Sequence, residues 1–166
     1  DQPARSSLEA GAELLAVINA SPFHVGKSQE RLARMADCAR LVGLPLVYAH
    51  LVGGQDEVVF DGASFALQAD GQMAARAPSF RESCFALRLD QAGSGWRWEA
   101  PVDTAPMALP GHEQELWDAL VTGVRDYVGK NGFPGVLLGL SGGIDSALVL
   151  AIAVDALGKD RVRTVM

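Results

Sequence analysis

The sequence is poor in cysteine and contains no long apolar run. It has two cysteines, Cys38 and Cys84, and cysteine this sparse is typical of a reducing cytoplasm rather than of a disulfide framework. The longest apolar run, at residues 147–154, is eight residues long, whereas a membrane-spanning helix needs roughly 20. We therefore predict a cytoplasmic protein with no membrane partner.

Basic residues are also in the minority. The chain has 14 Lys+Arg against 20 Asp+Glu, a formal net charge of -6, and this balance argues against a nucleic-acid partner. The richest basic run, at residues 27–40, is interleaved with Glu30 and Asp37 and predicts a solvated helix face. With 49% hydrophobic and 20% charged residues, the composition is that of a globular protein.

One short segment carries a chemical signal. Residues 139–146 read Gly-Leu-Ser-Gly-Gly-Ile-Asp-Ser between an apolar strand and an apolar helix. Two adjacent glycines let the backbone approach a bulky anion, and the first N–H groups of the helix point at the same place. This context predicts a phosphate site, with an ATP-binding set of Gly139, Leu140, Ser141, Gly142, Gly143, Ile144, Asp145 and Ser146.

The segment is not an ordinary phosphate-binding loop, because no lysine occurs between Lys130 and Lys159. An acid, Asp145, stands there instead. A carboxylate would repel phosphates unless a cation bridged them, so we predict that Asp145 contacts Mg²⁺, which binds through one or two carboxylates plus substrate phosphates. The alternative is a Gly-Gly turn that Asp145 or Ser146 caps, with no ligand.

The loop resembles the Ser-Gly-Gly-x-Asp-Ser loop of the N-type ATP pyrophosphatases, which cleave ATP to AMP and pyrophosphate while activating a carboxylate or carbonyl. Its flanks narrow the resemblance. Asp126-Tyr127-Val128, Lys130-Asn131-Gly132-Phe133 and Ala147-Leu148-Val149-Leu150 are similar to the glutamine-dependent NAD synthetases within that group.

Hydrophobic patterning predicts a layered α/β arrangement at the start of the chain. Apolar runs at residues 14–18 and 45–51 predict strands, and residues 27–42 between them predict a helix that Gly43 terminates. The predicted buried stripe of that helix is Leu32, Met35, Ala39 and Val42. Short strands are then expected at residues 58–67, 72–77 and 84–89.

Glycine and proline interrupt the hydrophobic pattern after residue 90. We place an interdomain linker at residues 93–111, with Trp96 and Trp98 packing it onto a domain surface. A helix is expected at about residues 113–130, and a strand at residues 161–166. The predicted buried stripe of this helix is Leu116, Leu120, Val124 and Val128.

The first half resembles the C-terminal part of a carbon–nitrogen hydrolase (nitrilase-like) domain, through Asn19-Ala20-Ser21-Pro22-Phe23, Val47-Tyr48-Ala49 and Phe60-Asp61-Gly62-Ala63-Ser64-Phe65. The resemblance implies a fold class of α/β: the C-terminal part of an α/β/β/α nitrilase-like glutaminase domain at residues 1–92, the linker at 93–111, and the first βα of a doubly wound Rossmann-like ATP pyrophosphatase domain at 112–166. The glutamate, lysine and cysteine that form the family's catalytic set would precede Asp1. We therefore expect an internal fragment with no catalytic residue.

The same resemblance implies that Ser21 and Lys27, six positions apart, bind substrate glutamine. The alternative is that Ser21 caps a turn and Lys27 is a surface residue. We expect Cys38 and Cys84 to be structural and His24 to be an ordinary loop residue. His50 and Gln55-Asp56-Glu57 line a glutaminase pocket or an ammonia route, or form a polar loop, and the sequence does not decide between these.

The implied reaction is ATP- and glutamine-dependent amidation of deamido-NAD to NAD through an acyl-adenylate, with ammonia from glutamine hydrolysis. Its cofactors would be ATP and Mg²⁺, and its partners deamido-NAD and L-glutamine. Keeping ammonia inside the protein needs domains in fixed relation, which favours a homo-oligomer. Two alternatives stay open: another glutamine-fed ATP pyrophosphatase amidotransferase, or, for the fragment alone, a catalytically inactive binding or assembly module. Residues that bind deamido-NAD are expected beyond Met166.

Overall fold

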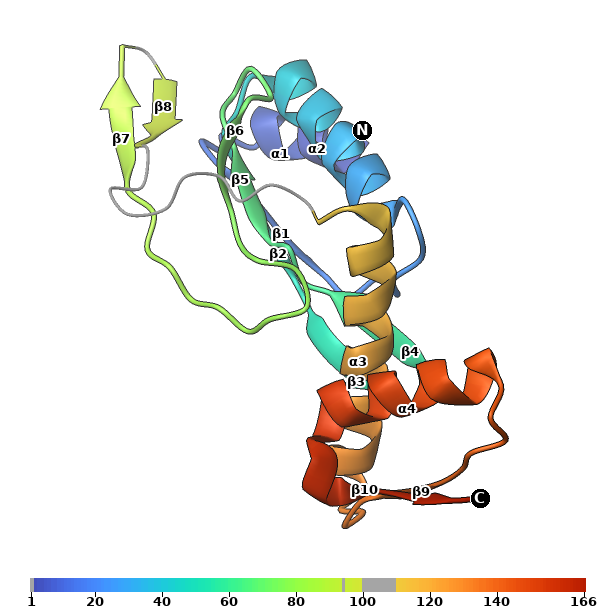
Figure 1. The fold of residues 1–166 in the computed structure, drawn as a ribbon. Helices are drawn as coiled ribbons and strands as arrows, with labels where there is room; N and C mark the ends of the chain where they lie inside the picture. Colours follow the sequence, from blue (N-terminus) through green and yellow to red (C-terminus); the bar gives the residue numbers. More distant parts are fainter. Residues whose placement is uncertain (1, 94, 100–109) are drawn as a thin grey trace. The chain divides into compact units, whose positions relative to one another are not determined.

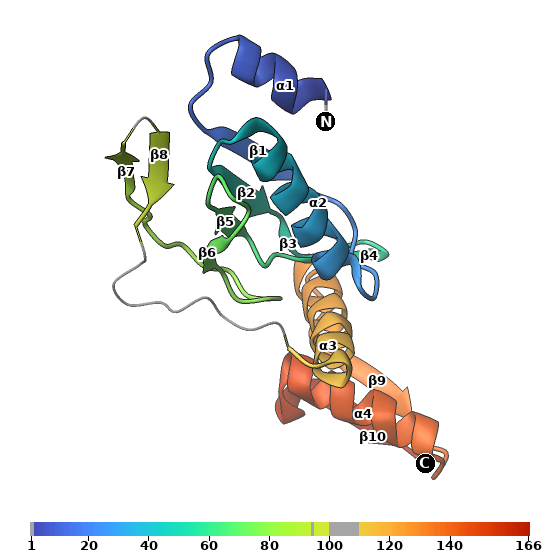
Figure 2. The same cartoon turned by 90° about the horizontal axis from the view of Figure 1, so that it is seen from above.

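The computed structural model describes residues 2–93, 95–99 and 110–166. The described residues form two compact units (Figures 1 and 2). The N-terminal unit is drawn from Asp1–Val52 and Asp61–Leu109, and the C-terminal unit from Gly53–Phe60 and Pro110–Met166. The chain therefore enters the C-terminal unit for a short segment, returns to the N-terminal unit, and enters the C-terminal unit again.

The N-terminal unit is built on a four-stranded sheet. Its elements are α1 (Gln2–Glu9), β1 (Leu15–Asn19), α2 (Lys27–Val42), β2 (Leu46–His50), β5 (Phe65–Leu67) and β6 (Met73–Arg76). The strand order is β1-β2-β5-β6, in which β1 and β2 are parallel and the other two pairs are antiparallel. The predicted α/β fold class is confirmed, and Figure 1 shows α2 as the crossover between β1 and β2.

Local signals explain the β1–α2–β2 unit. Helix α2 begins after Gly26, whose φ is 81°, and ends at Gly43, whose φ is 66° and whose N–H donates to the Ala39 carbonyl at 2.8 Å. Glycine adopts this left-handed conformation without the steric cost that a Cβ would add. The predicted helix at residues 27–42 and its glycine terminator are confirmed, and both flanking strands lie within the predicted runs to one residue.

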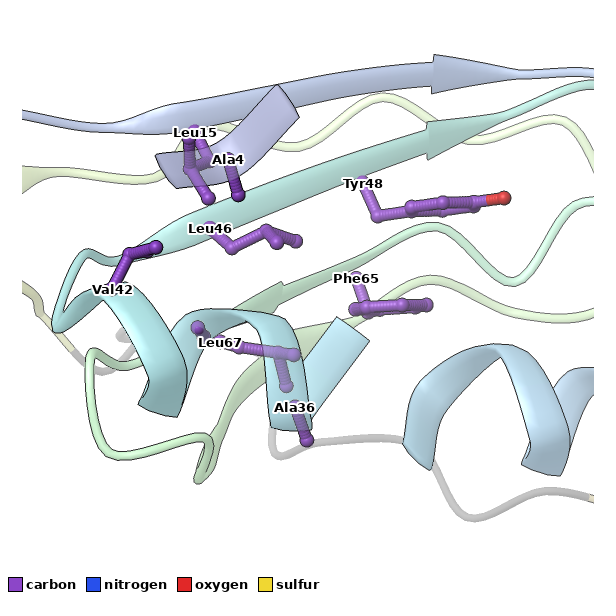
Figure 3. Close-up of a cluster of buried hydrophobic side chains, with 9 residues drawn as sticks. Ala4, Leu15, Ala36, Val42, Leu46, Tyr48, Phe65 and Leu67 are labelled. Atoms are coloured by element: carbon purple, nitrogen blue, oxygen red, sulfur yellow. The ribbon is translucent and has the colours of Figure 1, made fainter. Parts of the chain in front are cut away.

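The main core of this unit lies between α1, α2 and the sheet (Figure 3). Leu46 and Leu67 are fully buried, and the rings of Tyr48 and Phe65 are stacked with centroids 4.9 Å apart. Each such leucine stabilises the fold by roughly 1.5–3 kcal/mol. The predicted stripe of α2 is confirmed, because Ala39 and Val42 are buried and Leu32 and Met35 pack against the same cluster.

A hairpin lies where the sequence predicted the end of a strand and the start of the linker. Strand β7 (Leu89–Ala92) pairs antiparallel with β8 (Gly95–Trp98), while residues 84–88 run as irregular chain, so the predicted strand at 84–89 is wrong. Trp98 is buried, its Nε1 donates to the Leu67 carbonyl at 3.1 Å, and its backbone exchanges hydrogen bonds with the Gln68 amide. The predicted linker thus begins with ordered structure, and its residues 100–109 lie outside the described residues.

The C-terminal unit contains a parallel βαβ arrangement. Helix α3 (His112–Lys130) precedes β9 (Val136–Gly139), α4 (Ile144–Leu157), a 3₁₀ turn η1 (Lys159–Arg161) and β10 (Val162–Val165). Strands β9 and β10 pair in parallel, with Val162 beside Val136. The predicted order of helix, strand, loop, helix and strand is confirmed for these residues. No helix of the described residues is long and apolar enough to cross a bilayer.

The second contribution to this unit is a hairpin of β3 (Val52–Gln55) and β4 (Val58–Asp61). Its residues 53–60 pack on α3, where the Gly54 N–H donates to Asp126 Oδ2 at 2.7 Å and Lys130 Nζ donates to the Gly54 carbonyl at 2.6 Å. A Cβ at Gly54 would lie 3.4 Å from both the Gly123 Cα and the Thr122 carbonyl. Glycine at these positions therefore allows the two backbones to approach closely.

This hairpin decides which face of α3 is covered. The predicted stripe is wrong at Leu116 and Leu120, which are 36% and 51% exposed, whereas Ala119, Thr122 and Val128 are buried. Hydrophobic spacing identifies the most apolar stripe, but the structure covers the stripe of small residues that admits the hairpin. The predicted position Val128 is correct, and Val124 is half-buried.

Candidate functional sites

The loop between β9 and α4 has the geometry of an anion site. Gly142 has φ 81°, and Gly143 is the N-cap residue of α4 with an extended conformation, φ -85° and ψ 161°. A Cβ at Gly142 would meet no atom of the described part of the chain within 4 Å, so these residues leave the loop open on that side. The left-handed conformation rather than crowding therefore accounts for glycine at position 142.

Two hydroxyl groups brace this loop. Ser146 Oγ donates to the Gly143 carbonyl at 2.9 Å, Ser141 Oγ lies 3.2 Å from Ser146 Oγ, and the Gly143 N–H points at Ser141 Oγ at 3.4 Å. Among the described residues, no side chain makes a capping hydrogen bond at the N-terminus of α4. The alternative of a side-chain-capped turn is therefore not what the structure contains, and the first N–H groups of a 14-residue helix remain available to an anion.

Asp145 lies in the first turn of α4 and is exposed. Within the described residues, no group of three or more His, Cys, Asp or Glu side chains is arranged to hold a metal ion. A single carboxylate does not make a protein-only metal cage. It does fit Mg²⁺ bound jointly by a carboxylate and phosphate oxygens, which is how this ion is usually held at nucleotide sites.

The second candidate site is a cavity of about 290 Å³ in the N-terminal unit. It lies at the carboxyl end of β1 and beside the first turns of α2, and it brings together both predicted glutamine-binding residues, Ser21 and Lys27. Its lining residues are Asn19, Ser21, Lys27, Glu30, Arg31, Arg34, Met35, Cys38 and Tyr48.

The two predicted residues have different surroundings in this cavity. The Ser21 N–H donates to Asn19 Oδ1 at 2.8 Å, which fixes the loop after β1. Lys27 begins α2, and its Nζ lies 3.4 Å from Glu30 Oε2, a partly exposed pair. Such a pair is weak because solvent screens it, so the Lys27 ammonium is available to an anionic ligand.

A buried ion pair joins Arg31, which lines the cavity, to Asp61, and it was not predicted from the sequence. Arg31 donates to Asp61 through Nη1 at 3.2 Å and Nη2 at 2.8 Å, and the side chains are 5% and 1% exposed. The Arg31 guanidinium also lies over the Tyr48 ring, 5.8 Å from its centroid. One signal was present: Arg31 precedes Met35 by four positions, so it belongs to the buried side of α2.

His50, whose role the sequence left open, is completely buried beside this pair. Its Nε2 lies 3.3 Å from Ser21 Oγ and its Nδ1 lies 3.6 Å from Asp61 Oδ1. Burial and the nearby Arg31 charge lower the pKa of His50, and the Asp61 carboxylate with the backbone of Ser21 and Gly62 opposes them only in part. The imidazole is therefore neutral at physiological pH.

The other residues considered from the sequence differ in exposure and in whether they line the cavity. His24 is exposed, with Nδ1 3.1 Å from the Val25 carbonyl, and Cys84 is exposed in irregular chain rather than at the start of a strand. Cys38 is half-buried, packs against the core and also lines the cavity. Gln55 ends β3 and Asp56-Glu57 form the turn of the β3–β4 hairpin, and none of the three is among the residues that line the cavity.

Comparison with known proteins extends over nearly the whole chain. Residues 116–166 match the NAD synthase family. The chain is 46% identical over 154 residues to the glutamine-dependent NAD(+) synthetase of Acinetobacter baylyi, covering 93% of this chain and 28% of that protein. It is 48% identical over 159 residues to the enzyme of the same name from Rhodobacter capsulatus, covering 95% and 28%.

Solved structures give the same result. The glutamine-dependent NAD+ synthetase of Acinetobacter baumannii, in complex with ADP, superposes with a TM-score of 0.90 at 42% identity, over 99% of this chain and 30% of that one. That of Cytophaga hutchinsonii superposes with a TM-score of 0.64 at 25% identity, over 92% and 25%. The chain thus spans less than a third of the length of these relatives, and it is homologous to one continuous stretch of them.

Proposed function

We propose that this chain, homologous to one stretch of the glutamine-dependent NAD(+) synthetases, works as the segment of such an enzyme that joins its glutamine site to its ATP site. The whole enzyme would amidate deamido-NAD to NAD with ATP and with ammonia from glutamine. The observation that carries the proposal is similarity at 46–48% identity across 93–95% of the chain. It is supported by an anion loop in one unit and a polar cavity in the other.

At the ATP end, the proposed ligands are the backbone N–H groups of the Gly142–Gly143 loop and of the first turn of α4. These groups would hold phosphate oxygens, while Ser141 and Ser146 keep the loop in shape. Asp145 would hold Mg²⁺ together with the phosphates, and the ion would neutralise charge as pyrophosphate leaves. The energetic reason for adenylation is general: a carboxylate is a poor electrophile, and AMP is a good leaving group.

At the glutamine end, the cavity would bind the amino-acid part of glutamine. Lys27 offers an ammonium group, and Ser21 offers a hydroxyl group at the carboxyl end of β1. The cysteine that attacks the amide, with its glutamate and lysine, is proposed to lie on a part of the enzyme that precedes this chain. This chain would then bind and orient glutamine without performing its hydrolysis.

Cytoplasmic location and homo-oligomeric assembly belong to the same proposal. Ammonia is protonated in water, so an enzyme that delivers it between two sites gains from a fixed arrangement of domains. Two cysteines and an acidic charge balance suit a cytoplasmic enzyme with small-molecule partners.

The deciding experiment uses the full-length enzyme that contains this chain. It is mixed with ATP, Mg²⁺, ammonia and one acceptor at a time: deamido-NAD, xanthosine monophosphate or aspartate. Pyrophosphate is measured. Release with deamido-NAD alone is expected. Release with either of the others, and none with deamido-NAD, would reject the substrate and leave another ATP pyrophosphatase amidotransferase in its place.

A further inference from the structure

Three neighbouring side chains of the N-terminal unit, Asp61, His50 and Ser21, connect the buried ion pair with the cavity. Asp61 Oδ1 lies 3.6 Å from His50 Nδ1, and His50 Nε2 lies 3.3 Å from Ser21 Oγ. Asp61 and His50 are fully buried, whereas Ser21 is half-buried and lines the cavity. Of these three residues Ser21 alone lines the cavity, so the other two can act on a ligand there only through Ser21.

The protonation of His50 follows from its neighbours. A neutral imidazole carries one N–H, and the two nitrogens face different groups. Nδ1 is buried without a hydrogen-bond partner among the described residues, and it faces the Asp61 carboxylate. A lone pair on Nδ1 would be buried against negative charge with no donor, which is costly. The proton therefore belongs on Nδ1, and Nε2 is the acceptor.

An acceptor at Nε2 sets the direction of the Ser21 hydroxyl. Its single proton points to His50 Nε2, and its two lone pairs remain as acceptors. The Tyr48 hydroxyl also hydrogen-bonds with Ser21 and uses one of these lone pairs. The pKa of Tyr48 is raised, chiefly by burial, so its hydroxyl stays protonated. Ser21 therefore presents an acceptor to a ligand.

An acceptor and an ammonium group recognise opposite ends of an α-amino acid. A carboxylate cannot donate to the lone pairs of Ser21, but an α-ammonium group can, and a hydrogen bond to a charged group is stronger than one between neutral groups. Lys27 across the cavity complements the α-carboxylate. The two residues thus divide the zwitterion between them, instead of both holding its carboxylate.

We propose that His50 and Asp61 are positioning residues which make Ser21 the acceptor for the α-ammonium group of glutamine, and so select α-amino acids over desamino amides. The inference rests on the proposed glutamine site. The same line of Ser, His and Asp would also suit a nucleophilic serine. Against this, Arg31 already compensates both oxygens of Asp61, and the His50–Asp61 separation of 3.6 Å exceeds a hydrogen bond.

The test compares glutamine with glutaramate, which has the same amide and carboxylate but no α-ammonium group. Ammonia release by the full-length enzyme gives kcat/KM for each. In the Ser21→Ala enzyme we expect kcat/KM for glutamine to fall about 10- to 100-fold and kcat/KM for glutaramate to change little. Only glutamine loses a charge-assisted hydrogen bond in this variant. His50→Phe is also expected to lower the ratio of kcat/KM for glutamine to kcat/KM for glutaramate. Lys27→Met should weaken both substrates alike and keep the ratio.

Controls separate this inference from the proposed site. His24→Asn lies in the same loop and should leave the ratio unchanged. NAD synthesis from free ammonia reports whether each variant is folded, and if His50→Phe fails this check, the Ser21→Ala ratio alone decides. Equal loss of glutamine and glutaramate in Ser21→Ala overturns the acceptor role but keeps the site. Unchanged use of glutamine in both Ser21→Ala and Lys27→Met rejects the site itself. Loss of kcat for both amides without a change in KM would identify Ser21 as a nucleophile.

Discussion

At the scale of single residues, the Arg31–Asp61 pair makes the N-terminal unit sensitive to loss of one partner. Both side chains are buried and doubly hydrogen-bonded. Arg31→Met leaves a buried carboxylate uncompensated, so we expect it to lower the free energy of unfolding by about 3–5 kcal/mol. Urea denaturation of the full-length enzyme, followed at the transition of this unit, measures the change.

The control for this prediction is Arg88→Met, because Arg88 and Glu99 form a solvent-exposed pair 3.8 Å apart. Its effect should stay below about 1 kcal/mol. The double variant Arg31→Met with Asp61→Asn should be more stable than Arg31→Met alone, since the orphaned charge is gone. Equal stability of the single and double variants would mean that Asp61 is not the group that Arg31 compensates.

His50 gives the same unit a defined dependence on pH. Its folded-state pKa lies below the ordinary value of 6.5 because of burial and the Arg31 charge. Between the two values the unfolded chain binds the proton and the folded chain does not, so this group's share of stability is complete above pH 6.5 and is lost as pH falls toward the lower folded pKa. Thermal unfolding of the enzyme and of His50→Phe from pH 7.5 to 5 should show a smaller acid loss in the variant. A parallel decline would assign the loss to other groups.

Asp145 is expected to account for the magnesium-dependent part of ATP binding. A ligand that binds only the folded state raises the unfolding temperature, so ATP should protect the full-length enzyme, and Mg²⁺ should add to that protection. Asp145→Asn should remove most of the addition and spare the protection by ATP alone. Asp160→Asn, an exposed acid of η1, is the control. An unchanged magnesium increment in Asp145→Asn contradicts the assignment.

At the scale of elements, α3 contains two glycines that the structure treats differently. A Cβ at Gly129 would meet nothing within 4 Å, whereas a Cβ at Gly123 would lie 3.3 Å from Val59 Cγ2 of the hairpin. Gly129→Ala should stabilise the helix by roughly 0.5–1 kcal/mol through propensity alone. Gly123→Ala should gain less or lose stability, because the hairpin must shift. Equal gains, measured by chemical denaturation, would show that the hairpin does not pack at this position.

The elements also show what the sequence could predict. α2, β1, β2 and the β9–α4–β10 unit were predictable because each carries its own signal: an apolar run, a helical period or a terminating glycine. The β3–β4 hairpin was not, since Val52-Gly53-Gly54-Gln55 has little strand propensity and is explained only by its approach to α3. The predicted buried face of α3 was wrong for the same reason. The sequence motif and the resemblance predicted the Gly142–Gly143 loop and the Ser21–Lys27 pair as binding sites, and these roles stay predictions. His50 and Asp61 needed the fold that brings residues 50 and 61 together.

At the scale of the whole molecule, the division of labour between the two units predicts separable defects. Lys27→Met should weaken the use of glutamine and leave free ammonia nearly as effective a nitrogen donor, because the cavity and the proposed ATP loop belong to different units. The measurement is NAD formation with each nitrogen source in the full-length enzyme. Equal loss with both would show that Lys27 acts in folding rather than in glutamine binding.

The course of the chain through the β3–β4 hairpin has a topological consequence. Residues 53–60 are covalently part of the first half of the sequence but pack with α3 in the C-terminal unit. A single cut of the backbone between residues 100 and 109 would therefore leave the two pieces in contact. One piece keeps the hairpin, and the other keeps α3, on which the hairpin packs. Detaching the hairpin from the first piece would take two more cuts, one on each side of residues 53–60. The chain thus passes from one unit to the other three times.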